Sequence, residues 1–133
     1  MLISRETDYA YRIVLYLAQK ELEHQNRTSM QIIAQDMEIP SRFAANILHQ
    51  LIKAGIIQSF RGNCGGYALA RPAKDITFLE VLEAAHGPLY INLCMKDAHL
   101  CNRNAASHCI VHEKLSGLQQ SLREQLSSLT FGD

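Results

Sequence analysis

Two interruptions of an otherwise periodic pattern restrict the fold of this chain more than any other feature. The first, Glu38-Ile39-Pro40, is a turn between two segments of helical periodicity. The second, Gly62-Asn63-Cys64-Gly65-Gly66, is a flexible turn between two short strand-like segments. Because a β-hairpin directly follows two helices joined by a tight turn, this order predicts a winged helix-turn-helix.

Apolar spacing and capping residues predict the helices of this unit. Thr28 or Ser29 can cap the second helix and Ser41 the third, which is expected to run to about Ala54 and to stop at Gly55. A first helix precedes them, with one apolar face formed by Ala10, Ile13, Val14, Leu17 and Ala18.

The hairpin and a fourth helix complete the unit. Strands are expected over Ile56–Phe60 and Tyr67–Ala70. A helix is expected from Thr77 to Gly87, because Glu80 stands three residues after Thr77 and completes a capping box.

The C-terminal third has a different pattern. From Pro88 to about Ser107 no convincing periodicity is present, and such long loops are usually functional or disordered. A long amphipathic helix follows, with apolar residues three or four apart at Val111, Leu115, Leu118, Leu122, Leu126 and Leu129. The sequence therefore predicts a mainly α-helical chain with a small hairpin. It comprises a winged helix-turn-helix domain over 1–87, a cysteine-containing loop over 88–109 and a long helix over 110–133.

The charges are balanced in number but not in position. Thirteen Lys and Arg residues oppose thirteen Asp and Glu residues, which by itself disfavours a nucleic-acid binder. Between Ile39 and Lys74, however, five basic residues and no acidic residue occur, so this block can face a polyanion. No apolar run approaches the roughly 20 residues of a membrane-spanning helix. Since no N-terminal signal pattern is present either, the expected compartment is the cytoplasm.

The third helix and the hairpin carry residues suited to reading DNA. Arg42, Asn46, His49 and Lys53 share the face opposite the apolar stripe, and Ser41 begins the same helix. Arginine and asparagine can reach base edges, while the later histidine and lysine can meet phosphates. Such a face alone is more often simply solvated, so DNA binding needs support from the hairpin as well.

The hairpin tip adds a basic residue and three glycines. Arg61 could enter a minor groove, and Gly62, Gly65 and Gly66 permit close approach of the backbone, although glycines there could equally serve turn geometry alone. Together the helix face, the hairpin and the absence of acidic residues favour DNA binding.

Three cysteines, Cys94, Cys101 and Cys109, lie in or beside the unpatterned loop. A reducing compartment argues against structural disulfides, and the absence of a CxxC pair argues against a standard zinc ribbon. Three thiolates on one loop suit a soft metal centre, with an iron–sulfur cluster as the leading choice and three unrelated thiols as the alternative. The fourth cysteine, Cys64, is expected to be a turn residue, with redox sensing at the hairpin as a weaker hypothesis.

A cluster normally takes a fourth ligand. His112 follows Cys109 by three residues and is the nearest candidate, and His99 and His108 also lie in or near the loop. No set of nucleophile, base and orienting group is present, so an enzyme is not predicted.

Three stretches of sequence carry a family resemblance. They are Met1-Leu2-Ile3-Ser4 through Thr7-Asp8-Tyr9-Ala10, then Leu51-Ile52-Lys53-Ala54-Gly55-Ile56-Ile57, then Arg61-Gly62-Asn63-Cys64-Gly65-Gly66-Tyr67-Ala68-Leu69-Ala70. With these and the three-cysteine loop, nearly the whole chain resembles the IscR/NsrR family of bacterial winged-helix transcription regulators.

The resemblance implies a homodimer, in which the long C-terminal helices pack together and two winged helices meet a pseudo-palindromic operator in double-stranded DNA. It also implies an iron–sulfur cluster held by Cys94, Cys101 and Cys109, with either His112 or a partner-donated Asp8 as the fourth ligand. The cysteine gaps of six and seven residues differ from the five often found in the family, so the nuclearity of the cluster is left open.

The function implied is a transcription regulator, in the first instance a repressor, that senses redox state, nitric oxide or iron status. The alternatives are a cofactor-free member controlled by a protein partner or a small ligand, and a zinc-bound regulator.

Overall fold

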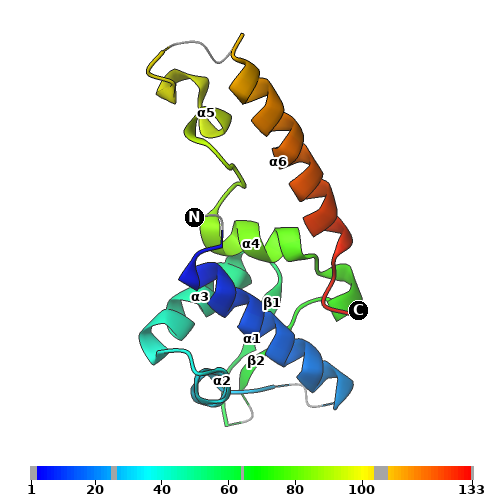
Figure 1. Ribbon diagram of the computed structural model, residues 1–133. Coiled ribbons are helices and arrows are strands. Elements are labelled where there is room, and N and C mark those ends of the chain that lie inside the picture. The colour runs from blue at the N-terminus through cyan, green and yellow to red at the C-terminus, as the bar shows by residue number, and fades with distance from the viewer. Residues whose placement is uncertain (1–2, 25–26, 64, 104–107, 133) are drawn as a thin grey trace.

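In the computed structural model, which describes residues 3–24, 27–63, 65–103 and 108–132, the chain forms two regions of different character (Figure 1). Residues 3–86 form a head of packed helices with a hairpin, and residues 87–132 form an arm whose upper part projects from the head. The head contains α1 (Arg5–Leu22), α2 (Met30–Met37), α3 (Ser41–Lys53), β1 (Ile57–Phe60), β2 (Gly66–Leu69), the 3-10 turn η1 (Ala73–Asp75) and α4 (Phe78–His86). The arm contains α5 (Leu93–Lys96), the 3-10 turn η2 (Ala98–Leu100) and α6 (Ile110–Ser128). The mainly helical winged-helix architecture is as predicted.

Helix α1 is the centre of the head. The Ser4 hydroxyl caps it by accepting a hydrogen bond from the Thr7 N–H at 3.2 Å. All five residues of the predicted apolar stripe are buried, and Tyr9 and Tyr16 extend the buried face. Burial of a large apolar side chain contributes about 1.5–3 kcal/mol, which makes α1 the main organiser of the core.

The helix-turn-helix follows the sequence except at one cap. Ser29, one of the two caps that the sequence offers, caps α2, and Glu38, in the left-handed region at φ +56°, ends it. The prediction that Ser41 caps α3 is wrong: Pro40 is the N-cap, and Ser41 is the first helical residue. Proline suits that position because its fixed φ is compatible with the approach to a helix and its carbonyl accepts from the Phe43 and Ala44 N–H groups at 3.0 Å.

The hairpin has two strands, as predicted, and one further pairing segment, an isolated bridge at Thr28. Ile57 pairs with Leu69 and Phe60 with Gly66 in an antiparallel register. Each strand is shorter by one residue than predicted at the end away from the tip, and β2 begins one residue earlier. Thr28 adds a short third segment, because its N–H and carbonyl both bond to Tyr67, at 3.0 and 2.8 Å.

Two further local predictions have opposite outcomes. The capping box of α4 is present, with the Thr77 hydroxyl accepting from the Glu80 N–H and the Glu80 carboxylate accepting from the Thr77 N–H. The segment expected to lack structure instead contains α5 and η2, which begin at the side-chain caps Asn92 and Asp97. Elements this short lie below the length at which apolar periodicity can be recognised.

The C-terminal end of α6 is fastened to the start of α4. Phe78 N–H donates to the Leu129 carbonyl at 2.9 Å, and Phe131 N–H donates to the Ile76 carbonyl at 3.2 Å. The Phe131 ring also stacks on Phe78, with centroids 4.5 Å apart. These contacts fix the position at which the C-terminal end of α6 joins the head.

A second, smaller core lies between α4 and α6. Leu79, Leu82 and Leu89 are buried there, and Leu122 and Leu126 of α6 pack against them. Within the described residues, no helix is long and apolar enough to cross a membrane.

Candidate functional site

Helix α3 has one buried and one exposed face. Ala44, Ile47, Leu48 and Leu51 are buried, whereas Phe43 and Ile52, which were expected to belong to the buried stripe, are only half-buried. The four residues predicted to face DNA, Arg42, Asn46, His49 and Lys53, are not buried; the structure leaves this side of the helix, with Ser41, accessible. Together these five residues form what we call the α3 face.

Arg42 is partly ordered by its neighbour. Its guanidinium lies 5.0 Å from the centre of the Phe43 ring, a distance at which a cation and an aromatic face attract one another. Since Ser41 is not used as a cap, its hydroxyl lies at the exposed N-terminal end of the helix without that role. The α3 face therefore offers a cation, a hydroxyl and an amide near its N-terminus, where recognition helices meet base edges.

The hairpin tip presents Arg61, Gly62 and Asn63 as exposed residues. Gly62 has φ +92° and open space around its Cα, so it serves the turn and leaves the backbone accessible. Cys64 lies outside the described residues. The tip therefore combines a cation with uncovered backbone.

Gly65 and Gly66 are required by contacts inside the protein. A Cβ on Gly65 would lie 2.5 Å from the Phe60 carbonyl oxygen, and a Cβ on Gly66 would lie 2.7 Å from the Thr28 carbonyl oxygen. Gly66 also has φ +141°, which disfavours other residues. Turn and strand geometry alone, one of the two alternatives raised by the sequence, thus accounts for these two glycines.

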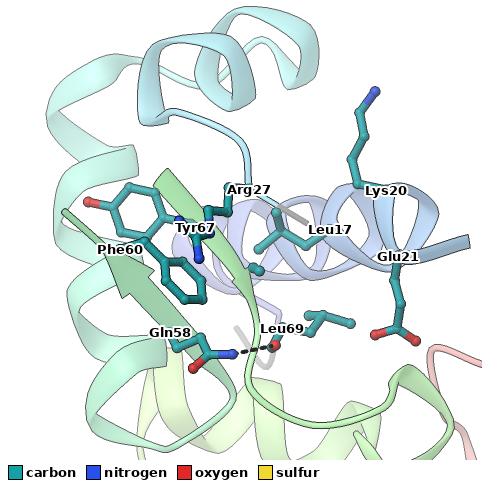
Figure 2. A pocket seen from close by; sticks show the side chains of 9 residues that line it. Leu17, Lys20, Glu21, Arg27, Gln58, Phe60, Tyr67 and Leu69 are labelled. Carbon is teal, nitrogen blue, oxygen red and sulfur yellow. Dashed lines mark hydrogen bonds between the residues drawn. The ribbon is translucent and has the colours of Figure 1, made fainter. Parts of the chain in front are cut away.

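A pocket of about 290 Å³ lies beside the hairpin, between β1, β2 and the second half of α1 (Figure 2). Arg27 crosses one wall with its guanidinium 4.0 Å from the centre of the Phe60 ring. Lys20 and Glu21 of α1 line the same pocket. No sequence pattern singles out Arg27, because it lies before the basic block and its packing on Phe60 depends on the third pairing segment at Thr28.

On the arm, the structure brings two of the predicted metal ligands together. Cys94 on α5 and His112 on α6 are half-buried, and the Cys94 Sγ lies 3.2 Å from the His112 Nδ1. The two residues are eighteen positions apart, so the contact depends on α5 folding back against α6. The direction of the hydrogen bond depends on the tautomer of the imidazole.

The other candidate ligands are more dispersed. Cys109 is the N-cap residue of α6 and Cys101 directly follows η2. Asp8 lies on α1 in the head and forms an ion pair with Arg12 at 2.9 Å. Among the described residues, no three His, Cys, Asp or Glu side chains are close enough together to hold one metal ion.

Several contacts continue the link between α6 and the segment before it. Ser116 donates to the Met95 Sδ at 3.3 Å, and the Gln119 Oε1 accepts from the Ile91 N–H at 3.0 Å. Nearer the head, Arg123 Nη1 lies 3.0 Å from Glu83 Oε2. The half of the arm that carries the cysteines is thus connected to α4 by polar contacts.

Shifted pKa values occur in the scaffold of the head. Burial raises the pKa of Tyr16 to about 12, and the 2.8 Å hydrogen bond that Tyr16 donates to Asp36 adds to the shift. Burial likewise raises the pKa of Tyr11 to about 12, and its hydroxyl donates to the Phe78 carbonyl. Burial would raise the pKa of Glu80, but hydrogen bonds from Thr77 and Arg71 outweigh it and lower that pKa. Tyr16 thus joins α1 to α2, Tyr11 joins α1 to α4, and Glu80 joins the start of α4 to Arg71.

Comparison with known proteins agrees with this architecture. Residues 3–133 match the Rrf2 family, described as an iron-dependent transcriptional regulator. The HTH-type transcriptional regulator NsrR of Shouchella clausii is 28% identical over 128 residues, covering 93% of this chain and 84% of that protein.

Two solved structures have the same fold. IscR of T. potens superposes with a TM-score of 0.78 at 24% identity, over all of this chain and 85% of that one. CymR, described as the global cysteine regulator of B. subtilis, superposes with a TM-score of 0.74 at 25% identity, over all of this chain and 95% of that one.

Proposed function

Because the chain belongs to the Rrf2 family and is a winged-helix transcription regulator, we propose that it is a homodimeric repressor whose affinity for operator DNA is set by an iron–sulfur cluster on the arm. The observation that carries this proposal is the 3.2 Å contact between Cys94 and His112, on a part of the chain separate from the α3 face and the hairpin tip. The regulator is not an enzyme, and we expect it to act in the cytoplasm, where bacterial DNA lies.

The donor set suits such a cluster chemically. Thiolates from Cys94, Cys101 and Cys109 are the ligands that iron–sulfur clusters prefer, and an imidazole can replace one thiolate. Cys109 is the N-cap of α6, where the unpaired N–H groups favour an anionic thiolate. When bound, the cluster would supply a redox-active and nitric-oxide-reactive centre. We favour His112 as the fourth ligand because it contacts Cys94; Asp8, the alternative, would come from the partner subunit and is paired with Arg12 within its own chain.

The DNA-binding role of the head follows from its exposed cations. We propose that the α3 face, with Ser41, Arg42, Asn46, His49 and Lys53, enters a major groove, and that Arg61 and Gly62 at the hairpin tip contact the adjacent minor groove or its phosphates. Gly65 and Gly66 act indirectly by allowing the hairpin to close. Binding of this kind weakens steeply as the salt concentration rises, because each phosphate contact releases a condensed counterion.

The exposed apolar residues of the arm support a dimer. Ile110, Val111 and Leu118 are 62%, 55% and 62% exposed, although they lie on an amphipathic helix. Within residues 108–132, no residue of α6 is buried. A long helix whose apolar residues at these three positions are left uncovered by the described part of its own chain is suited to packing against the same helix of a second copy.

Anaerobic purification tests the proposal. The wild-type protein should contain iron and acid-labile sulfide and show charge-transfer absorption in the visible range. Alanine variants of Cys94, Cys101 and Cys109 should each lose them. His112→Ala should change the spectrum and Asp8→Ala should not; the reverse pattern would favour the ligand from the first helix. Wild-type protein without iron or sulfide would contradict the proposal.

Zinc is the second candidate, because one thiol and one imidazole in contact also suit Zn²⁺. Metal analysis of the same preparations separates the two metals. A metal-free protein whose operator binding is unaffected by cysteine substitution would instead favour the cofactor-free alternative, with control by a protein partner or a small ligand.

A further inference from the structure

One polar face of α6 makes the side-chain bonds that join this helix to α4 and to the segment 87–97. His112, Ser116, Gln119 and Arg123 are spaced i, i+4, i+7 and i+11, so they lie on one face. Each is half-buried and bonds to the segment between α4 and η2 or to α4 itself: to Cys94, Met95, Ile91 and Glu83, respectively. We call these four contacts the polar ladder. Its upper end is the proposed sensor, and its lower end lies on the head.

The lowest contact differs from the others because one oxygen accepts two donors. Glu83 Oε2 accepts from the Leu89 N–H at 3.1 Å and from Arg123 Nη1 at 3.0 Å. Leu89 belongs to the segment that leaves α4 for the arm, and Arg123 belongs to α6. A single carboxylate therefore joins α4, the outgoing chain and the returning helix.

Apolar packing fixes this junction from the other side. The Leu89 side chain is 4% exposed and lies in the second core with Leu79 and Leu82 of α4. The backbone leaves α4 at Gly87, which has φ +94°. Any displacement of residues 89–91 must therefore move the Leu89 side chain, lengthen its bond to Glu83, or both.

Helix α4 links this junction to the α3 face. Val81 of α4 is fully buried in the main core together with Ile47 and Leu51 of α3. Ala84 and Ala85, next to Glu83, also pack against that core. A rotation of α4 therefore displaces the recognition helix, because close-packed interiors transmit small displacements.

We propose that Glu83, together with Arg123, is the positioning pair that couples the state of the arm to the orientation of α3. Neither residue belongs to the α3 face, the hairpin tip or the metal-ligand set. The pair acts by keeping the outgoing segment, α6 and α4 in one arrangement, so that a change at Cys94 and His112 reaches α3 through α4. This inference rests on the proposed function for the identity of the signal, but the coupling itself can be tested without a cluster.

The test uses the linkage between the two sites: if the conformation of the arm influences DNA binding, DNA binding must shift the conformational equilibrium of the arm, and with it the accessibility of Cys94 to a reagent. Reduced, metal-stripped dimer is alkylated with iodoacetamide, with and without saturating operator DNA selected from a random duplex library. The rate at Cys94 is followed by peptide mass spectrometry. In wild-type protein, operator should change that rate by about fivefold or more.

Glu83→Ala should reduce the operator effect to below about twofold, and Glu83→Gln, which keeps one acceptor oxygen without its charge, should fall between. Glu124→Ala is the matched control, because Glu124 is an exposed α6 carboxylate bonded to Gln120 of its own helix. It should keep the full operator effect. Far-UV circular dichroism and melting curves establish that each variant is folded; if Glu83→Ala is not, the comparison rests on Glu83→Gln.

Three results would overturn the inference: an undiminished operator effect in the folded Glu83 variants, an equal loss in Glu124→Ala, or no operator effect in the wild type. Iron and sulfide content, measured on separate anaerobic samples, judges the proposed function independently. Loss of coupling with a full cluster content would support both proposals.

Discussion

The head and the arm are stabilised by different kinds of contact. In the head, twenty of the residues that the structure describes, from α1 to α4 and the hairpin, are buried in one apolar core. In the described part of the arm, α6 has no buried residue, and its upper half is connected to α5 by the polar ladder. A single hydrogen bond contributes about 0.5–1.5 kcal/mol net, whereas full burial of a large apolar side chain contributes about 1.5–3 kcal/mol.

This difference has a functional consequence. The packing inside the head is too costly to break within a regulatory event, so α4, the α3 face and the hairpin keep their contacts and move together when α4 rotates. The arm is joined by weaker contacts that a bound group at Cys94 and His112 could strengthen or break. Rigid reading elements attached to an adjustable arm suit a regulator that responds to a signal.

The largest expected effect comes from the head core. Leu51→Ala, at a position with 0% exposure, should cost about 2–5 kcal/mol of unfolding free energy, because it leaves a cavity in the main core beside α3. Leu22→Ala is the matched control: the same side chain is 80% exposed at the end of α1 and should cost less than about 0.5 kcal/mol. Urea titrations of both variants measure the difference. Equal losses of unfolding free energy in the two variants would contradict the view that the buried apolar core is what stabilises the head.

A smaller effect is expected at the hairpin. In Gly66→Ala the new methyl group would lie 2.7 Å from the Thr28 carbonyl oxygen at a φ of +141°, so the third pairing segment must move. The expected cost is about 1–3 kcal/mol. Thermal melting measures it, and operator affinity should fall as well because the Arg61 tip is displaced. Unchanged stability and affinity would show that the hairpin tolerates a shift of Thr28.

Replacing a glycine of the arm should stabilise the protein, whereas replacing Gly66 of the hairpin should destabilise it. Gly117 lies in the middle of α6, and nothing lies within 4 Å of the place that an alanine methyl group would take. Gly117→Ala should therefore stabilise the helix by about 0.5–1 kcal/mol through its higher helix propensity. Hydrogen exchange of the α6 amides should slow while exchange in α1 stays the same. Faster exchange in α6 would mean that a second copy packs against Gly117 and requires its small size.

The smallest expected effect is a pH dependence at the start of α4. Since Glu80 has a lowered pKa in the folded state, its carboxylate form stabilises the fold above the unfolded pKa, and this contribution is lost as the pH falls through the folded pKa. Its side chain is 41% exposed, so the contribution stays below about 1 kcal/mol. Glu80→Gln should lower the melting temperature slightly at neutral pH and not at acid pH. If the melting temperature of Glu80→Gln is also lowered at acid pH, the substitution acts through packing and not through the charge.

The head could be predicted well from the sequence because its signals are local. The stripe on α1, the Ser29 cap, the turn at Pro40 and the capping box at Thr77 each depend on residues within a few positions of one another. The exposed face of α3 followed directly from helical spacing. The error at Ser41 arose because a proline carbonyl, rather than a hydroxyl, serves the first turn.

The arm was less predictable because its signals are not local. Its short elements have too few residues for periodicity, and its contacts join residues far apart in sequence, such as Cys94 with His112 and Glu83 with Arg123. The leucine pattern of α6 was visible in the sequence, but the polar ladder on another face of that helix was not. Only its partners on α4 and α5 distinguish it from an ordinary solvated face. Likewise, the internal contact of Gly66 depends on the position of Thr28, and that of Gly65 depends on the closed turn that brings it to the Phe60 carbonyl.

Control of the head by the arm is tested most directly by measuring operator affinity in one anaerobic preparation before and after removal of iron. Fluorescence anisotropy with the selected operator duplex at fixed salt gives the two dissociation constants, and the His112→Ala variant is measured in parallel. We expect the two constants to differ by about fivefold or more in wild-type protein and by much less in His112→Ala. Iron-containing wild-type protein whose operator affinity does not change when the iron is removed would contradict this control.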